Sequence, residues 1–330
     1  MLLFISIVTS QTQALQNVPL GEIDFFGQTG VDVSRVIQSL PVKVGDSLDS
    51  STFADRTEAI ERSIESTIHL RPTDIGLAFY DEHGKAIMFI GIPGPTVVQT
   101  SFNHDPFTDA TLPENGFALY QSFMDALSHA KASSLRNEDD SKGYAVFADP
   151  ELGALQIAMR TYALSHVEGI YRGLGSRQAQ VREASADLLG YAESSPKQIR
   201  ALAHSMFDPD ESTRNNAIRA LKVLVGWNPR FSSQVPADRL IGLLSSGIWT
   251  DRNKGVSLVM AITSTRPKRL LQAIKGRSLS SLEEMARWTN PLHARSAQII
   301  LGRIAGFTDE KTLQLCKDGR VEEVIAAAQA

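Results

Sequence analysis

Cysteine is nearly absent from this chain. Among its 330 residues, Cys316 is the one cysteine. A single thiol cannot form a disulfide within the chain, and it cannot supply a zinc site built from several cysteines. We therefore expect Cys316 to act as a small apolar residue in a late helix.

Long apolar runs are also missing. The run Met1–Val8 is too short to cross a bilayer, and no other stretch is long and apolar enough to form a membrane helix. The sequence therefore predicts no membrane span in the mature chain. The run suits the apolar part of a secretory signal, with Ala14 placed for cleavage, although no Lys or Arg precedes it. We therefore interpret residues 1–16 as a signal peptide and expect a periplasmic or secreted protein. A cytoplasmic protein with a buried apolar start is the alternative.

Catalytic signatures are absent as well. The chain contains no His-Glu-x-x-His, Gly-x-Ser-x-Gly, P-loop or Gly-x-Gly-x-x-Gly motif, and none of its seven histidines has a partner at metal-ligand spacing. Ser194 and Lys197 fit a Ser-x-x-Lys pattern, but the companion motifs are missing and Pro196 predicts a helix start there. We expect no catalytic, cofactor-binding or metal-binding residues, and therefore no enzyme.

The charge is unevenly distributed. Residues 1–170 hold 10 Lys and Arg against 22 Asp and Glu, whereas residues 171–330 hold 23 against 15. An acidic front half and a basic back half indicate two modules with different surfaces. The predicted fold is mainly α, with a small α/β module over residues 17–98, a linker and helix over 99–150, and helical repeats over 151–330.

The front module alternates strand and helix patterns. Strands are expected at 20–26, 75–80 and 85–92, the last two as a hairpin, and helices at 31–40 and 51–68. This β-α-α-β-β order, together with the segments Ile23–Gly27 and Val42–Leu48, resembles a POTRA domain of bacterial envelope proteins. The resemblance implies a docking platform with an exposed strand edge. The alternative is a small α/β fold that only orients the rest of the chain. Because no β-barrel follows, the resemblance implies no role in protein translocation.

The middle of the chain is irregular. Residues 93–112 are typical of a linker or irregular cover, and a helix is expected over 113–132. The acidic run Glu138–Asp140 lacks the ligand pattern of a calcium loop, so we expect a solvated loop. Asp149 before Pro150 predicts the start of a helix that runs to about Leu174.

Beyond residue 175 the sequence repeats itself. Four segments share a small residue followed four positions later by an aliphatic one, at offsets of 32, 38 and 42 residues. Stacked helix pairs have this period, because no single pair can bury its own apolar face. The matched positions are Ser185 and Leu189, Ala217 and Leu221, Gly255 and Val259, and Ala297 and Leu301. Prolines at 196, 236, 267 and 291 fall where helices should begin.

An arginine stands three residues before the small residue in three of the segments. These are Arg182, Arg214 and Arg252, and the fourth segment has Ala294 with Arg295 beside it. The segments resemble HEAT or armadillo repeats over about residues 165–330. That resemblance implies that each arginine braces the connector of its own or the next repeat. The family's Asp six residues before the Arg is present at Asp208, while Ser176 and Ser246 replace it elsewhere.

Three functions are consistent with these patterns. The first is a non-enzymatic protein-binding scaffold in a bacterial envelope, whose protein partners the sequence does not identify. The second is nucleic-acid binding through the basic half, which is disfavoured because the three tryptophans lie near predicted helix ends rather than in a basic aromatic cluster. The third is an enzyme similar to the HEAT-like lyases that attach bilin pigments, which no residue pattern supports.

Overall fold

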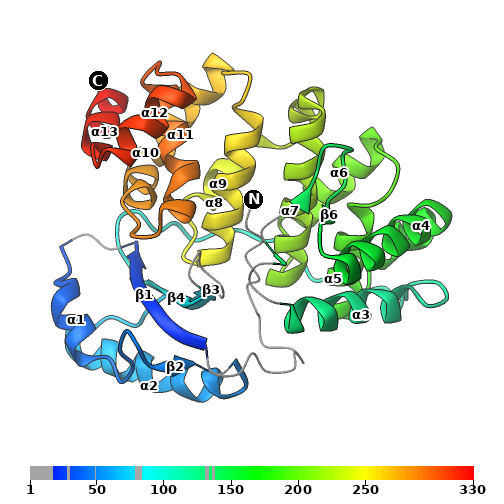
Figure 1. Cartoon of the computed structure of the whole chain (residues 1–330), viewed down its shortest axis with the longest axis horizontal. Helices are drawn as coiled ribbons and strands as arrows, with labels where there is room; N and C mark the ends of the chain where they lie inside the picture. Colours follow the sequence, from blue (N-terminus) through cyan, green and yellow to red (C-terminus); the bar gives the residue numbers. More distant parts are fainter. Residues whose placement is uncertain (1–17, 28–29, 49, 79–83, 131–133, 136–137) are drawn as a thin grey trace. The chain divides into compact units, whose positions relative to one another are not determined.

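The computed structural model describes residues 18–27, 30–48, 50–78, 84–130, 134–135 and 138–330 (Figure 1). The signal peptide and most of the hairpin loop expected from the sequence lie outside these residues. Contacts divide the described chain into two compact units, one of residues 101–236 and one that combines residues 18–100 with 237–330. The sequence-based boundaries, after residues 98 and 150, differ from this division because contacts join segments that are distant in the chain.

A four-stranded sheet forms the N-terminal part of the second unit. Its strand order is β2-β1-β4-β3, with β1 parallel to β4 and the other neighbours antiparallel. The strands are β1 (Val18–Phe26), β2 (Ser47–Leu48), β3 (Asp74–Ala78) and β4 (Ala86–Gly91), with α1 (Val33–Ser39) and α2 (Ser50–Ile68) between them. The expected order of strand, helix, helix, strand and strand is confirmed, and β2 is an addition that the sequence did not predict.

Helices α1 and α2 cover one face of this sheet. Val36 of α1 and Ile60 and Ile64 of α2 are fully buried against Leu20 and Met88 of the sheet. The helical residues recur three or four positions apart, and this spacing places them on one side of each helix. The helix pattern read from the sequence therefore corresponds to the contact with the sheet.

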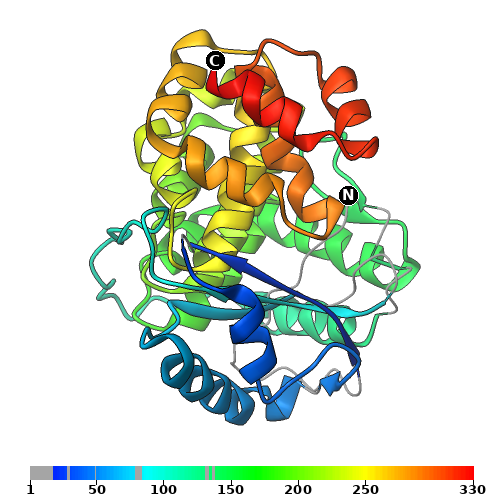
Figure 2. The same ribbon diagram turned by 90° about the vertical axis from the view of Figure 1, so that its left-hand side faces the viewer.

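The opposite face of the sheet packs on C-terminal helices (Figures 1 and 2). The ring of Phe89 lies 4.4 Å from that of Trp249, 5.3 Å from that of Trp288 and 5.1 Å from that of His293. A carboxylate oxygen of Asp74 in β3 accepts a hydrogen bond from the Trp249 backbone N–H at 2.8 Å. All six residues of β4 are buried, as expected for a strand covered on both faces.

The C-terminal helices of this unit form stacked pairs. They are α8 (Ala237–Leu243), α9 (Trp249–Ile262), α10 (Lys268–Ala286), α11 (Pro291–Ile304), α12 (Asp309–Lys317) and α13 (Val321–Gln329). Helix α8 packs on α9, α10 on α11 and α12 on α13, while α11 also contacts α9 and α13. The expected helical repeats are therefore present, and Pro236, Pro267 and Pro291 lie at or just before helix starts.

The other unit contains the earlier helix pairs. Its elements are α3 (Gly116–His129), β5 (Glu138–Asp139), β6 (Val146–Phe147), α4 (Pro150–Gly173), α5 (Ala179–Leu189), α6 (Pro196–Ser205), α7 (Glu211–Trp227) and a short 3₁₀ helix, η1 (Pro229–Gln234). Helix α4 packs on α5, α6 on α7, and α5 on α7. The Asp149 carboxylate accepts the first N–H groups of α4, as the sequence predicts. Helix α4 departs from helical geometry at His166.

Candidate functional site beside strand β1

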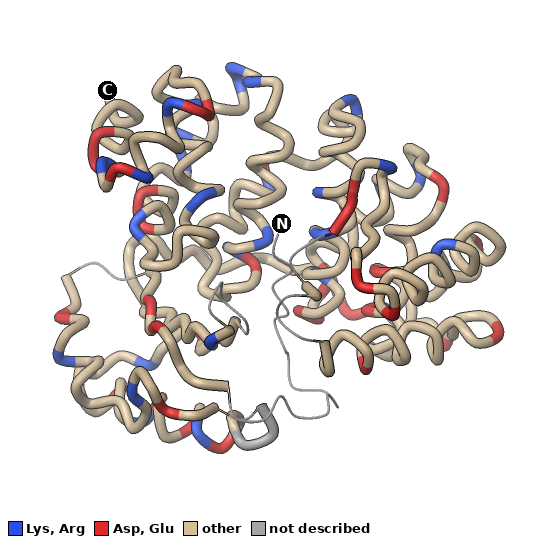
Figure 3. The backbone as a smooth tube through the Cα atoms, viewed as in Figure 1, with Lys and Arg blue, Asp and Glu red and all other residues tan. Residues whose placement is uncertain are grey.

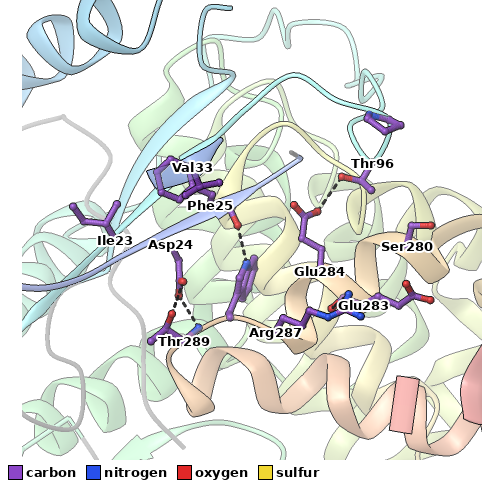
Figure 4. A pocket seen from close by; sticks show the side chains of 12 residues that line it. Ile23, Asp24, Phe25, Val33, Thr96, Ser280, Glu283, Glu284, Arg287 and Thr289 are labelled. Carbon is purple, nitrogen blue, oxygen red and sulfur yellow. Dashed lines mark hydrogen bonds between the residues drawn. The ribbon is translucent and has the colours of Figure 1, made fainter. Parts of the chain in front are cut away.

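A hollow of about 660 Å³ lies between β1 and helix α10 in the second unit (Figure 4). Strand β1 contributes one wall, the end of α10 and the residues after it contribute another, and the segment after β4 closes a side. The lining residues are Ile23, Asp24, Phe25, Val33, Pro95, Thr96, Ser280, Glu283, Glu284, Arg287, Trp288 and Thr289. Apolar and charged groups therefore line one concave surface, as in many binding sites.

Strand β1 presents backbone groups at this wall. The N–H of Ile92 donates to the carbonyl of Phe26 at 2.8 Å, so Phe26 directs its backbone toward β4. Neighbouring residues of a strand direct their N–H and C=O to opposite sides, so Phe25 and Ile23 direct theirs away from β4. The Phe25 carbonyl accordingly accepts the Trp288 indole N–H at 3.3 Å. Among the described residues, none hydrogen-bonds the outward backbone groups of Ile23.

Asp24 joins strand β1, one wall of the hollow, to the connector between α10 and α11. Its carboxylate accepts the backbone N–H of Thr289 at 3.0 Å and the Thr289 hydroxyl at 2.8 Å. Burial raises the pKa of Asp24 above its ordinary value, and the Thr289 hydrogen bonds oppose that increase. No cationic side chain of the described chain forms an ion pair with Asp24.

The α10 wall carries the remaining charges. Glu284 accepts the Thr96 hydroxyl at 2.9 Å and an Arg252 N–H at 2.9 Å, while its other oxygen is buried without a hydrogen-bond partner among the described residues. Arg287 donates to both carboxylate oxygens of Glu322 at 2.7 Å. Glu283 accepts the side-chain amide of Gln329 at 2.8 Å, and that donor is neutral.

The repeat arginines lie at the connectors. Arg182 donates to the Ser176 carbonyl of its own connector and to the Asp208 carboxylate of the next one at 2.9–3.1 Å. Arg214 donates to the carbonyl of Asp208, in its own connector, at 2.9 Å. The Asp208 carboxylate thus bonds the arginine of the preceding segment, whereas its backbone carbonyl bonds the arginine six residues later.

Arg252 joins its connector to the wall of the hollow. It donates to the Ser246 carbonyl at 2.6 Å, to the Thr96 carbonyl at 2.6 Å and to Glu284. Arg252 is therefore a sequence-predicted repeat position that hydrogen-bonds residues lining the hollow, namely Thr96 and Glu284. Arg295 and Ala294 lie on α11 in the corresponding place, where Ala294 is buried.

The small and aliphatic repeat positions are buried between helices. Ser185, Leu189, Ala217 and Leu221 lie on α5 and α7, and Gly255, Val259, Ala297 and Leu301 lie on α9 and α11. A Cβ atom at Gly255 would lie 3.0 Å from the Leu243 Cβ of α8. Helices α8 and α9 are therefore in close contact at Gly255, the small residue of this repeat segment. These eight positions shape the repeats and do not line the hollow.

A buried polar cluster in the first unit corrects one expectation. Glu138 was expected in a solvated loop, but its side chain is fully buried and forms an ion pair with Arg219 of α7. Arg219 also lies 3.5 Å from Asp187, while Gln156 donates to the Tyr191 hydroxyl at 3.0 Å. A buried carboxylate requires a partner, and here that partner is distant in sequence. No acidic pattern near residue 138 could have indicated it.

No local sequence pattern marks the hollow. Its residues come from β1, the start of α1, the segment after β4 and the end of α10, so no local motif contains them. One signal was present, because the uninterrupted apolar run Ala86–Ile90 is typical of a strand buried on both faces. That run indicates that a second layer covers the sheet, although it does not identify the layer.

Within the described residues, no group of three His, Cys, Asp or Glu side chains could hold a metal ion. Among the helices of the same residues, none is both long and apolar enough to cross a membrane.

Comparison with known proteins finds similar solved structures, two of which are described below. No protein-family model and no curated protein matches the chain. An engineered protein is similar at a TM-score of 0.41 and 16% identity, over 66% of this chain and 95% of its own. A computationally designed armadillo repeat protein for modular peptide recognition has a TM-score of 0.39 and 15% identity, over 64% of this chain and 97% of its own. Similarity at this level assigns no function to the chain.

Proposed function

We propose that this protein is a non-enzymatic protein-binding scaffold, and that an extended segment of a partner protein docks in the hollow beside β1. The observation that carries the proposal is the outward N–H and C=O of Ile23, which lack partners among the described residues at the wall of the hollow. An unpaired strand edge can accept a strand from another chain through backbone hydrogen bonds. Ile23 is half-buried, so part of the residue remains accessible to a partner.

The hollow suits such a segment. An extended chain rises about 3.3 Å per residue and points alternate side chains to opposite sides. A segment paired with β1 would therefore direct alternate side chains into the hollow, where Val33, Pro95 and Trp288 supply apolar surface. Backbone pairing contributes affinity and the hollow contributes specificity.

The carboxylates of the hollow favour binding over catalysis. Asp24 is hydrogen-bonded to Thr289, and Glu284 is bonded to Thr96 and Arg252. These bonds hold the connector and the strand in place. They occupy both carboxylate oxygens of Asp24 and one of Glu284, whose other oxygen is buried, so these carboxylates are poorly placed to act as a general base. The arrangement therefore supports a scaffold more than an enzyme.

Nucleic-acid binding has less support. Many arginines of the basic half are bonded to carboxylates, among them Arg182, Arg252, Arg287 and Arg303. Figure 3 shows acidic residues beside basic ones along α10–α13. Phosphate binding needs basic groups that are available to the phosphate backbone. A protein partner is therefore the better proposal.

The binding proposal is tested by selecting random linear peptides on the purified protein and measuring their affinity in solution. Ser280 is exposed and lines the hollow, so Ser280→Trp should fill the site with little effect on α10. The matched control is Gln272→Trp, because Gln272 is exposed on the same helix and does not line the hollow. We expect selected peptides to lose binding to Ser280→Trp and retain it with Gln272→Trp. Failure to select any peptide, or equal binding to both variants, would contradict the proposal.

We further propose that the protein works in a bacterial cell envelope. The apolar start Met1–Val8 and the resemblance of residues 18–98 to a POTRA domain support this location. Cell fractionation with mass spectrometry of the mature N-terminus tests it. An envelope protein that begins near Leu15 is the expected result, and a cytoplasmic protein that retains Met1 would overturn the location.

A further inference from the structure

The hollow has an excess of negative charge. Its charged groups and their ion-pair partners are Asp24, Glu283, Glu284 and Glu322 against Arg252 and Arg287. Within the described part of the chain, four carboxylates stand against two guanidinium groups, so negative charge exceeds positive charge by two. A partly enclosed site strengthens such charges, because they are screened less than charges on an open surface.

The excess negative charge of the hollow lies at Asp24 and Glu283. Arg252 pairs with Glu284 and Arg287 pairs with Glu322, so both guanidinium groups already have a carboxylate partner. Asp24 on the strand wall is hydrogen-bonded to the neutral Thr289, and Glu283 on the helix wall is hydrogen-bonded to the neutral Gln329. Arg287 also attracts Glu283, but the carboxylate that hydrogen-bonds the Arg287 guanidinium is that of Glu322. A cation that entered the hollow would find these two carboxylates available as charge partners.

Burial makes the negative charge of Asp24 costly. The residue is 8% exposed and has no ion pair with a described cation, and burial raises the pKa of its carboxyl. An opposite charge nearby stabilises the ionised form of such a group. A cationic guest would therefore gain more from Asp24 than from an exposed carboxylate.

The shape of the hollow favours a long side chain. Val33 and Phe25 supply apolar surface next to the carboxylates, and Ile23 supplies the backbone edge. Lysine and arginine bury an aliphatic stem against apolar surface while the charged end reaches a polar group. Resting on the proposed docking at β1, we propose that the docked segment carries a lysine or arginine side chain, whose cation enters the hollow and is attracted by Asp24 and Glu283.

The test uses synthetic peptides with capped ends and the sequence Thr-Val-Thr-X-Thr-Val-Thr, where X is lysine, norleucine or glutamate. Norleucine keeps the aliphatic stem of lysine and removes its charge. Binding to the full chain is measured by fluorescence anisotropy at low and high salt. We expect the lysine peptide to bind about three- to tenfold more tightly than the norleucine peptide, and the glutamate peptide to bind most weakly. High salt should reduce the difference.

Two charge variants locate the effect. Glu283→Gln should reduce the preference for lysine over norleucine, because it removes one carboxylate of the hollow. Glu310→Gln changes the net charge equally at an exposed position of α12 outside the hollow, and should leave the preference unchanged. Equal loss of preference in both variants would show a general charge effect and overturn the inference.

The outcomes separate this inference from the proposed function. If all three peptides bind equally and Ser280→Trp abolishes their binding, the docking site stands and the cationic inference is wrong. Tightest binding by the glutamate peptide would also overturn it. If none of the peptides binds the wild-type chain, both the inference and docking at β1 are overturned.

Discussion

The ring of Phe89 in β4 stacks on the indole of Trp249 at the start of α9, with centroids 4.4 Å apart and planes 16° apart. Both side chains are fully buried. This contact joins the N-terminal sheet to the C-terminal helices in one core. The two segments therefore form one unit, and β1 is held where it can form a wall of the hollow.

Trp249→Ala should remove the indole that packs between the sheet and the C-terminal helices. We expect it to lower the free energy of unfolding by about 3–5 kcal/mol, because a large side chain leaves a cavity that its neighbours cannot fill. Trp227→Ala is the matched control, since Trp227 ends α7 and is 46% exposed. Denaturant unfolding measures both. A smaller loss for Trp249→Ala than for Trp227→Ala would contradict the role given to the Phe89 contact.

Removal of residues 1–98 should disrupt the C-terminal helices. This truncation uncovers Trp249, Trp288 and His293, which otherwise pack on the sheet. We expect red-shifted tryptophan emission and a less cooperative unfolding transition, because apolar surface becomes exposed to water. If residues 99–330 unfold at the same denaturant concentration as the full chain, the sheet is an independent module.

Asp208→Ala should destabilise the first unit. Arg182 and Asp208 are both almost fully buried and lie 2.9 Å apart, so the substitution leaves a buried guanidinium without its partner. We expect a loss of about 3–5 kcal/mol in the free energy of unfolding. The exposed pair Arg62 and Glu58 supplies the control, and Glu58→Ala should cost less than about 1 kcal/mol. Equal losses would show that burial of the Arg182 pair has no energetic consequence.

Gly255→Val should separate α9 from α8. A Cβ at this position would already lie 3.0 Å from the Leu243 Cβ, and valine adds two methyl groups. Overpacking of this kind costs about 1–3 kcal/mol. Gly276→Ala in α10 should instead stabilise the chain by about 0.5–1 kcal/mol, because its Cβ would meet no atom within 4 Å. Thermal unfolding of the two variants should shift in opposite directions.

Glu183 should make stability depend on pH. Burial raises the pKa of its carboxyl from 4.5 to about 7, although the Tyr120 hydroxyl donates to it at 2.8 Å. Below pH 4.5 the folded and unfolded states are both protonated, and the stabilisation from the raised pKa is fully present. As the pH rises from 4.5 to about 7, the unfolded state loses this proton first, so the free energy of unfolding falls.

The variant Glu183→Gln isolates this contribution. Between pH 4.5 and 7 the wild type should lose up to about 3 kcal/mol of its free energy of unfolding through Glu183, and the variant should not have this loss. Denaturant unfolding across that range measures the difference, and the other titrating groups are common to both proteins. Parallel pH profiles for the two would contradict a raised pKa at Glu183.

Local patterns predicted the elements well. Asp149 caps the start of α4 and Pro196 begins α6, because capping and proline geometry depend on a few adjacent residues. The spacing of Ile60 and Ile64 identified the buried face of α2. The two-residue strands β2, β5 and β6 were missed, since a strand of that length has no periodicity and depends on its partner.

The sequence by itself determined most of the helices, the longer strands of the sheet and the pairing of the later helices, because hydrophobic spacing and caps act over neighbouring residues. The tertiary structure alone decided that the sheet joins the C-terminal pairs, that Glu138 is buried on Arg219, and that Asp24 and Glu283 share a hollow. These relations join residues far apart in the chain, and close packing selects them from many arrangements with the same local pattern. The candidate site is therefore formed by the tertiary structure and not by any local segment of the sequence.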